Sequence, residues 1–214
     1  MDSPIIADAI EFVKDLFASD FSGHDLHHTL RVCRMAERLA EAEHADRETV
    51  LLAALLHDAD DRKLSPQTYE RKDNARRFLR EHSVPEERIE AIVHIIGQVS
   101  FAGTDSVVPD TVEGKCVQDA DRLDAIGAIG IARAFAYGGS RSRSIWAPDI
   151  APRMNMTAEE FRTNYSSTVN HFYEKLLLLK DMMNTPSARA IAEERDVYMR
   201  AFLTEFFAEW DGRK

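Results

Sequence analysis

A short segment of the chain brings together one histidine and three aspartates. Residues 50–63 read VLLAALLHDADDRK, so a run of apolar residues leads directly into His57, Asp58, Asp60 and Asp61. If the apolar run is a helix, these acids lie at its C-terminal end, where the helix dipole is already negative. A buried carboxylate there is costly unless a cation offsets its charge. A lysine or arginine side chain or a divalent metal ion would serve, and Asp60 could instead hydrogen-bond a reversal of the chain.

Three other residues of the same chemical types lie on helical patterns. His28 begins an apolar stripe that continues four, seven and eleven positions later, although a lone histidine there is more often an ordinary core residue. Asp121 lies on a polar edge beside an apolar stripe in residues 112–124, and its apolar neighbours indicate partial enclosure. His94 is set in residues 91–104, which carry no charged side chain. A histidine in such a stretch is more often structural than catalytic.

The composition argues against several classes of protein. The 214 residues include 27 Lys and Arg against 37 Asp and Glu, a net charge of −10, which disfavours binding of a nucleic-acid polymer. The N-terminus lacks a basic region followed by an apolar core, and no apolar run approaches the roughly 18 residues that span a bilayer. We therefore expect a cytoplasmic protein without a membrane partner. Cys33 and Cys116 lie in apolar helical patterns, which predicts buried free thiols.

The elements that must position these residues are all predicted to be helices. Prolines and glycines are few and cluster at the ends of long periodic segments, which indicates an all-α fold with one domain over residues 1–214. Residues 138–156, rich in Gly, Ser, Arg and Pro, form either a connector or a lid. The predicted helical regions are 4–18, 25–43, 47–58, 66–82, 85–97, 112–137, 157–183 and 186–210.

Taken in order, His28, the His57–Asp58 pair and Asp121 resemble the ligand pattern of the HD-domain superfamily of metal-dependent phosphohydrolases. The segments GHDLHHTLRV, LLAALLHDADD and QDADRL are similar to its three motifs. The resemblance covers about residues 22–134. It implies a helical HD bundle in which these four residues bind one divalent cation of the manganese, magnesium, nickel, cobalt or zinc class.

The C-terminal helical extension, about residues 157–211, is similar to a bacterial subgroup of small HD hydrolases, some of which resemble nucleotide pyrophosphohydrolases. Asp61 is then a candidate general acid or base, with a salt bridge to Arg62 or Lys63 as the alternative. Lys63 is the nearest candidate for a phosphate contact within a segment rich in basic residues.

The dinuclear phosphodiesterase branch of this superfamily has further histidines between the HD pair and the last aspartate. Here only His82 and His94 lie between Asp58 and Asp121, so the resemblance favours a single metal. His82 ends a predicted helix, so we expect it outside the site. His94 is then a candidate catalytic or phosphate-contacting residue.

The function that the resemblance implies is hydrolysis of a nucleotide, foremost a (d)NTP to a (d)NMP and pyrophosphate. Phe101 could line a base pocket, and Arg122 and Asp124 are candidate substrate contacts beside the last motif. A 5′-nucleotidase acting on (d)NMP and a non-catalytic nucleotide-sensing module are the alternatives. A homodimer through the C-terminal helices is a further possibility.

Overall fold

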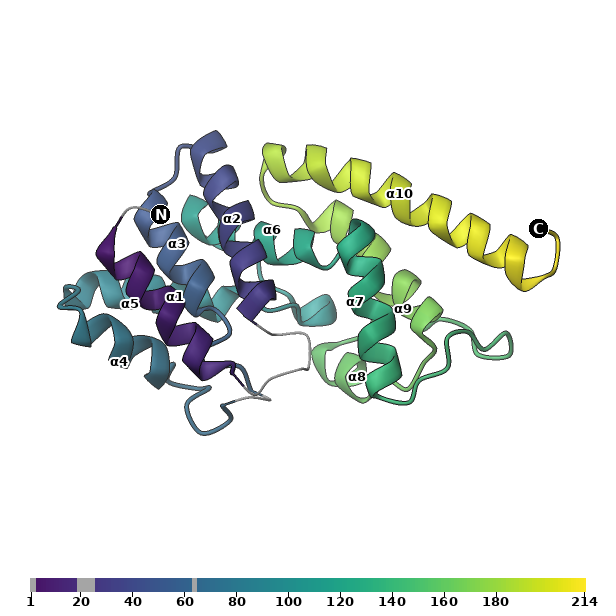
Figure 1. Cartoon of the computed structure of the whole chain (residues 1–214), viewed down its shortest axis with the longest axis horizontal. Coiled ribbons are helices and arrows are strands. Elements are labelled where there is room, and N and C mark those ends of the chain that lie inside the picture. The colour runs from purple at the N-terminus through teal and green to yellow at the C-terminus, as the bar shows by residue number, and fades with distance from the viewer. Residues whose placement is uncertain (1–2, 19–25, 63–64) are drawn as a thin grey trace. The chain divides into compact units, whose positions relative to one another are not determined.

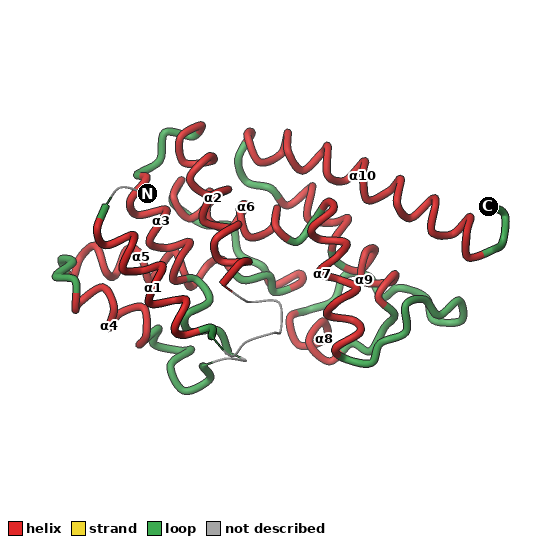
Figure 2. Tube along the Cα trace, in the orientation of Figure 1, coloured by secondary structure: helices red, strands yellow, loops and turns green. Residues whose placement is uncertain are grey.

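The computed structural model describes residues 3–18, 26–62 and 65–214. Every regular element in these ranges is helical, which confirms the predicted all-α fold (Figure 2). The chain divides into two compact units. Unit 1 comprises residues 1–100 and 107–121, and unit 2 comprises residues 101–106 and 122–214. The single domain expected over residues 1–214 stays a prediction.

Unit 1 is built around a helix that is buried on every side. In α3 (Arg47–Leu56), all residues from Val50 to Leu56 have no exposed surface, as the uniformly apolar sequence predicts. Helices α1, α2 and α5 contact it (Figure 1). The helices of this unit are α1 (Pro4–Leu16), α2 (Leu26–Ala42), α3, α4 (Asp73–Glu81), α5 (Glu86–Val99) and the greater part of α6 (Val112–Asp124).

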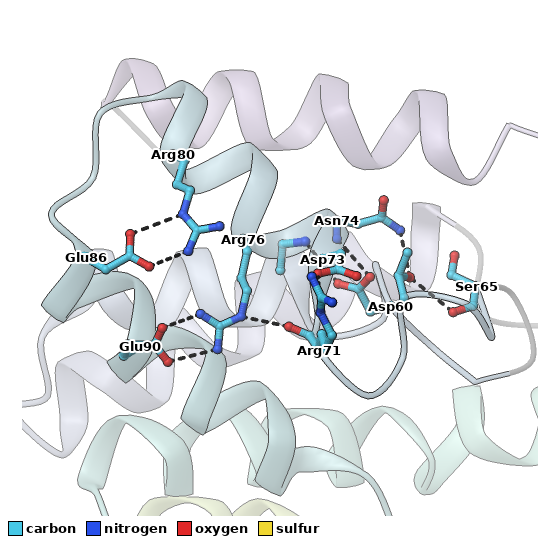
Figure 3. A network of polar contacts seen from close by, with 11 residues as sticks. Asp60, Ser65, Arg71, Asp73, Asn74, Arg76, Arg80, Glu86 and Glu90 are labelled. Atoms are coloured by element: carbon cyan, nitrogen blue, oxygen red, sulfur yellow. Dashed lines mark hydrogen bonds and ion pairs between the residues drawn. The ribbon is translucent and has the colours of Figure 1, made fainter.

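The reversal after α3 is held by an aspartate of the acidic segment. Asp60 is fully buried, and its two carboxylate oxygens accept hydrogen bonds from the backbone N–H groups of Asn74 and Ala75, both at 3.0 Å. The Asn74 side chain donates in turn to the carbonyl of Ala59 at 2.9 Å. Figure 3 shows Asp60 beside Asn74 at the start of α4. Asp60 therefore satisfies the free N–H groups at the start of α4, which is the structural role left open for it above.

Two predicted helices are corrected by the structure. The region 66–82 is helical only from Asp73, because residues 66–72 form turns and Lys72 has a left-handed φ of 55°. The region 112–137 is two helices, α6 and α7 (Gly127–Ser140), which part at Ile126, where the backbone is extended. Gly127 adopts φ 75°, and a Cβ there would lie 2.9 Å from the Arg195 side chain.

Unit 2 contains shorter elements around one long helix. They are η1 (Gly103–Asp105), α7, α8 (Ala158–Thr163), α9 (Thr168–Glu174), η2 (Leu176–Met182) and α10 (Pro186–Trp210). The predicted helical region 157–183 is thus interrupted, because Asn164 is extended and Ser167 caps α9 by accepting from the N–H of Asn170. In unit 2, the buried ring of Phe172 and the half-buried rings of Phe135, Phe202 and Phe206 form an aromatic cluster, with neighbouring centroids 5.9–6.5 Å apart.

The irregular segment between α7 and α8 is bonded along α9. Four groups between residues 144 and 153 exchange hydrogen bonds with four residues of this helix. Such a chain of bonds favours a fixed connector over a lid. The pairs are the Thr168 N–H with the Ser144 carbonyl, the Val169 N–H with the Ile145 carbonyl, the Asn170 amide with the Ile150 carbonyl, and the Arg153 N–H with the Glu174 carboxylate.

Two further expectations concern the thiols and the membrane. Cys33 and Cys116 are buried and free as predicted, and burial raises the pKa of each thiol to about 12. Both thiols therefore remain protonated near neutral pH. Across the described part of the chain, a bilayer-crossing helix with sufficient length and apolar character is not found.

The close packing of α7 on α9 gives a stability prediction. A Cβ on Gly138 would lie 2.1 Å from the hydroxyl oxygen of the buried Thr168, whereas one on Gly139 would meet nothing within 4 Å. Gly138→Ala should therefore destabilise the protein by about 1–3 kcal/mol through overpacking. Gly139→Ala should be neutral or stabilise by about 0.5–1 kcal/mol, as alanine does in a helix.

Urea unfolding of the two variants checks this difference. Adding Thr168→Ala to Gly138→Ala should recover part of the loss, because it removes the clashing oxygen. Equal stabilities of the two glycine variants would show that this contact does not limit the approach of the helices.

Candidate metal centre

Four side chains from three helices of unit 1 meet at the C-terminal end of α3. His28 lies in the first turns of α2, His57 caps the end of α3, Asp58 follows it, and Asp121 lies near the end of α6. His28, His57 and Asp58 expose only 1%, 7% and 6% of their surface. The side chain of Asp121 is 26% exposed. The buried position of α3 thus brings a charged pair into the protein interior.

The distances between these groups match a shared ligand shell. The His28 Nε2 lies 3.5 Å from Asp58 Oδ2 and 3.4 Å from Asp121 Oδ1. The His57 Nε2 lies 3.2 Å and 3.8 Å from the same two oxygens. Two ligand atoms that each bind an ion at about 2.1 Å are about 3.0–3.4 Å apart at ordinary coordination angles. One donor atom from each of His28, His57 and Asp58 falls in a group whose members are all within 4.8 Å.

The orientation of His57 leaves the correct nitrogen for a metal. Its Nδ1 lies 2.8 Å from the carbonyl oxygen of Ala54, so the N–H of this nitrogen donates to the backbone. The Nε2 then carries the lone pair, as in histidines that ligate metals. This Nε2 is buried and has no hydrogen bond of good geometry within the described ranges, and its neighbour Asp58 Oδ2 lies 3.2 Å away. A divalent cation would satisfy it, so the residues present fit a metal ion.

Within the cluster, protonated imidazoles and ionised carboxylates stabilise one another, and a bound cation could replace the positive charge of the imidazoles. Burial lowers the pKa of His57, but the charges of Asp58 and Asp121 outweigh this and leave the pKa raised. Burial raises the pKa of Asp121, but the hydrogen bond and charges of His28 and His57 leave it lowered. A metal ion requires the neutral imidazole, so metal binding should strengthen as the pH rises through the raised pKa of His57.

Lys72, which the sequence did not single out, follows the acidic segment. The Asp61 N–H donates to the Asp58 carbonyl at 3.0 Å, so Asp61 follows the pair within one turn. Lys63 lies outside the described residues. Lys72 is half-buried with its ammonium 4.0 Å from the centre of the Tyr69 ring. The signal that could have indicated Lys72 is the excess of basic residues after Asp61.

Electrostatics links Lys72 to the acidic segment. Burial lowers the pKa of the ammonium, and the charges of Asp60, Asp61, Glu70 and Asp58 act in the opposite direction. The hydrogen bonds of Asp60 to the start of α4 place this lysine near the segment, because Lys72 immediately precedes that helix. Lys72 is therefore a cation beside the candidate metal centre.

The remaining predicted site residues have other contacts in the structure. His94 is 54% exposed, and its Nε2 lies 2.9 Å from Asp110. Arg122 is buried and donates to the carbonyl of Met182. Asp124 accepts from Arg133 at 2.8 Å. Their predicted roles in catalysis or substrate binding are not tested by these contacts and stay predictions.

Phe101 and His82 complete the set. Phe101 packs against Phe161 in unit 2, with ring centroids 5.2 Å apart. His82 contacts the carbonyl of Phe78 and the carboxylate of Asp8 instead of the four ligand candidates. The expectation that His82 lies outside the site agrees with these contacts.

The site and fold define a class of protein. The family model of the HD domain matches residues 25–126. YpgQ of Bacillus subtilis (strain 168) is 38% identical over 196 residues, which are 91% of this chain and 88% of YpgQ. The chain belongs to the HD-domain superfamily.

Solved structures agree with this assignment. A protein from Lactobacillus plantarum has a TM-score of 0.86 at 39% identity, covering 99% of this chain and all of that one. An HD-superfamily hydrolase from Bacillus thuringiensis has a TM-score of 0.76 at 43% identity, covering 96% of both chains. YpgQ crystallised with ADP has a TM-score of 0.75 at 36% identity, covering 95% of this chain and 97% of that one. The resemblance inferred from the three motifs is confirmed.

Metal addition should stabilise the protein through the four ligands. Because an ion that binds only the folded state adds about 2.7 kcal/mol at 100 times its Kd, manganese should raise the Tm of protein stripped with EDTA. His57→Ala should abolish most of this shift. Asp110→Asn, which changes an exposed acid beside His94, should leave it intact. Differential scanning fluorimetry measures all three proteins, and an equal shift in the His57 variant would place the ion elsewhere.

Proposed function

We propose that this protein is a metal-dependent phosphohydrolase that acts on nucleotides, foremost converting a (d)NTP to a (d)NMP and pyrophosphate. The observation that carries the proposal is the convergence of donor atoms from His28, His57 and Asp58 within 4.8 Å, with Asp121 beside both imidazoles. The ADP complex of YpgQ supports a nucleotide as the ligand. The relatives' membership of a hydrolase superfamily supports the reaction class.

The ligand set suits hydrolysis at a phosphorus atom. Two neutral imidazoles and two carboxylates balance the charge of a dication and leave positions for other ligands. When bound, the divalent ion supplies Lewis-acid activation of a phosphate oxygen and of water. The buried helix end fixes His57 and Asp58, and the Ala54 carbonyl fixes the tautomer of His57, so the ligands are oriented in advance.

Other side chains of the acidic segment and the turn after it would transfer the proton and contact the phosphates. Asp61 is half-buried and directly follows Asp60, which caps the start of α4, so Asp61 is the proposed general acid or base. Lys63 and Lys72 are proposed to contact phosphate oxygens, because ammonium groups bind phosphate as point charges. His94, Arg122, Asp124 and Phe101 remain proposed substrate or catalytic contacts from the sequence.

Two alternatives keep the same metal centre. A 5′-nucleotidase would use the same ligands on a (d)NMP, and the difference would depend on the length of the phosphate pocket. A nucleotide-sensing module would bind without turnover. Four preserved ligand candidates in a buried position favour an enzyme, because a module without chemistry has no need of charges that are costly to bury. A homodimer and a cytoplasmic location also belong to the proposal.

A screen of nucleotides with identified products tests the proposed reaction. With manganese, the protein should release pyrophosphate from at least one (d)NTP, and the double variant His57→Ala, Asp58→Ala should lose on the order of 100-fold or more of the rate. Asp181→Asn, which changes an acid whose side chain is 80% exposed beside Lys180, serves as the folded control. Release of phosphate from monophosphates alone would instead establish the nucleotidase. Equal rates for wild type and double variant across the panel would overturn the enzyme proposal.

Replacement of Lys72 tests the proposed phosphate contact. Lys72→Met should lower kcat/KM by about 10- to 100-fold, because it removes a charge-assisted hydrogen bond worth about 1.5–3 kcal/mol. Lys72→Arg should recover part of the activity. Arg71→Gln is the matched control, because Arg71 precedes Lys72 and its side chain is 82% exposed. If Lys72→Met changes stability but not kcat/KM, the lysine only balances the charge of the acidic segment.

A further inference from the structure

Three basic side chains gather around α9 in unit 2. The N–H of Lys175 donates to the carbonyl of His171 at 3.0 Å, so these residues are one helical turn apart and share a face. Arg143 approaches from the fixed connector, where the neighbouring Ser144 carbonyl accepts from the N–H of Thr168 at 2.9 Å. The N–H of Arg143 itself donates to the carbonyl of Gly138 at 2.9 Å. Backbone hydrogen bonds therefore hold all three residues in place.

The Arg143 guanidinium donates to the carbonyl of Asn164 at 3.4 Å, and its charge and that of Lys175 both act on His171. Burial lowers the pKa of His171, and the positive charges of Lys175 and Arg143 lower it further, to about 3. Its ring is therefore neutral at physiological pH. The carboxylate nearest in sequence, Glu174, is buried and accepts from the Arg153 N–H at 3.1 Å and the Asn164 amide at 3.0 Å. The charges that act on His171 are both positive.

Two aromatic rings border the basic residues. The ring of Phe161 lies 5.9 Å from His171 and 5.2 Å from Phe101. The Lys175 ammonium lies 4.6 Å from the Phe101 centroid and 5.7 Å from the Phe161 centroid, within the range of cation–π contact. The five residues are half-buried, so each keeps part of its surface at the solvent.

The positions of the rings are fixed by the backbone of unit 2. The N–H of Thr104 donates to the Met156 carbonyl, and the N–H of Ala158 donates to the Asp105 carboxylate, both at 2.9 Å. These bonds join the segment that carries Phe101 to α8, which carries Phe161. A cationic group with a bordering aromatic wall is thus prearranged.

We propose that Arg143, His171 and Lys175, with Phe101 and Phe161 beside them, form a binding site in unit 2 for the phosphates of a nucleotide. An arginine and a lysine whose charges both act on one neutral imidazole can both donate to one phosphate anion. Arginine and lysine are the usual phosphate donors of proteins, and the rings offer faces on which a base stacks. The choice of a nucleotide rests on the proposed function, whereas the phosphate site follows from unit 2 alone.

Binding of inorganic pyrophosphate and of ADP to the full-length protein in EDTA tests the site without hydrolysis. By calorimetry, Arg143→Gln and Lys175→Gln should each weaken pyrophosphate binding by about 10-fold or more, the loss typical of a charge-assisted contact. Arg141→Gln is the matched control, because it removes an exposed charge of the same connector that lies 5.5 Å from the Tyr137 ring, as Arg143 does at 5.7 Å. The control should change binding by less than about twofold.

The titration of His171 gives a second readout. By NMR, pyrophosphate should raise the pKa of His171 in the wild type and in Arg141→Gln, and much less in Arg143→Gln. Lys175→Gln alone should raise this pKa without ligand, because it removes one of the two positive neighbours. ADP should bind more tightly than pyrophosphate, and weaker binding would overturn the assignment of a nucleotide.

The result that overturns the phosphate site is distinct from failure of the proposed enzyme. Pyrophosphate that does not bind the metal-free wild type, or that binds it and both basic variants equally, eliminates the site even if manganese-dependent hydrolysis is found. Conversely, a protein that binds pyrophosphate through Arg143 and Lys175 but hydrolyses nothing retains the site and loses the enzyme. Arg143 lies outside the helices, so Arg143→Gln decides the outcome if Lys175→Gln fails to fold.

Discussion

The burial of charge at the end of α3 is the constraint on which the rest of unit 1 depends. The helix is apolar on every face and is covered by α1, α2 and α5, so its C-terminal residues are carried into the interior. His57 and Asp58 are therefore buried where the helix dipole adds negative charge. Imidazoles balance the carboxylates, and a dication would balance them more completely, because it also satisfies the Nε2 of His57. This arrangement is the basis of the proposed metal site.

The acids near the end of α3 have two roles: one caps a helix, and the others belong to the candidate site. Asp60 is committed to the N–H groups at the start of α4, so it is not available to a metal or substrate. Asp58 and Asp121 face the histidines, and Asp61 continues the segment. The same capping interaction brings Lys72 near the acids. A single buried carboxylate thus fixes the turn that supplies a cation to the candidate site.

Unit 2 contains a cluster of basic side chains, whereas the candidate metal centre in unit 1 contains carboxylates. Its irregular connector is held by hydrogen bonds to α9, and Gly138 lets α7 approach Thr168. These contacts bring Arg143 to His171 and Lys175, where like charges meet beside two aromatic rings. The cluster that contains Asp58 and Asp121 lies in unit 1, and the cluster that contains Arg143 and Lys175 lies in unit 2. Each group has the charge that a counter-ion of opposite sign would balance, a metal in one case and a phosphate in the other.

The sequence by itself determined the helical fold and the burial of α3, because periodicity is a local property of the chain. The grouping of His28, His57, Asp58 and Asp121 came from the resemblance of their segments to the HD-domain motifs. Only the tertiary structure decided where helices stop and which cations reach the acids. Gly127, which follows the break at Ile126, has φ 75° and no room for a Cβ beside Arg195, and the late start of α4 accompanies the capping by Asp60. Arg122 donates to Met182, sixty residues away, and Asp124 accepts from Arg133 of the next helix. The turn before α4 sets which acids act on Lys72. Contacts between distant residues leave no periodic signal, because they depend on how the helices pack.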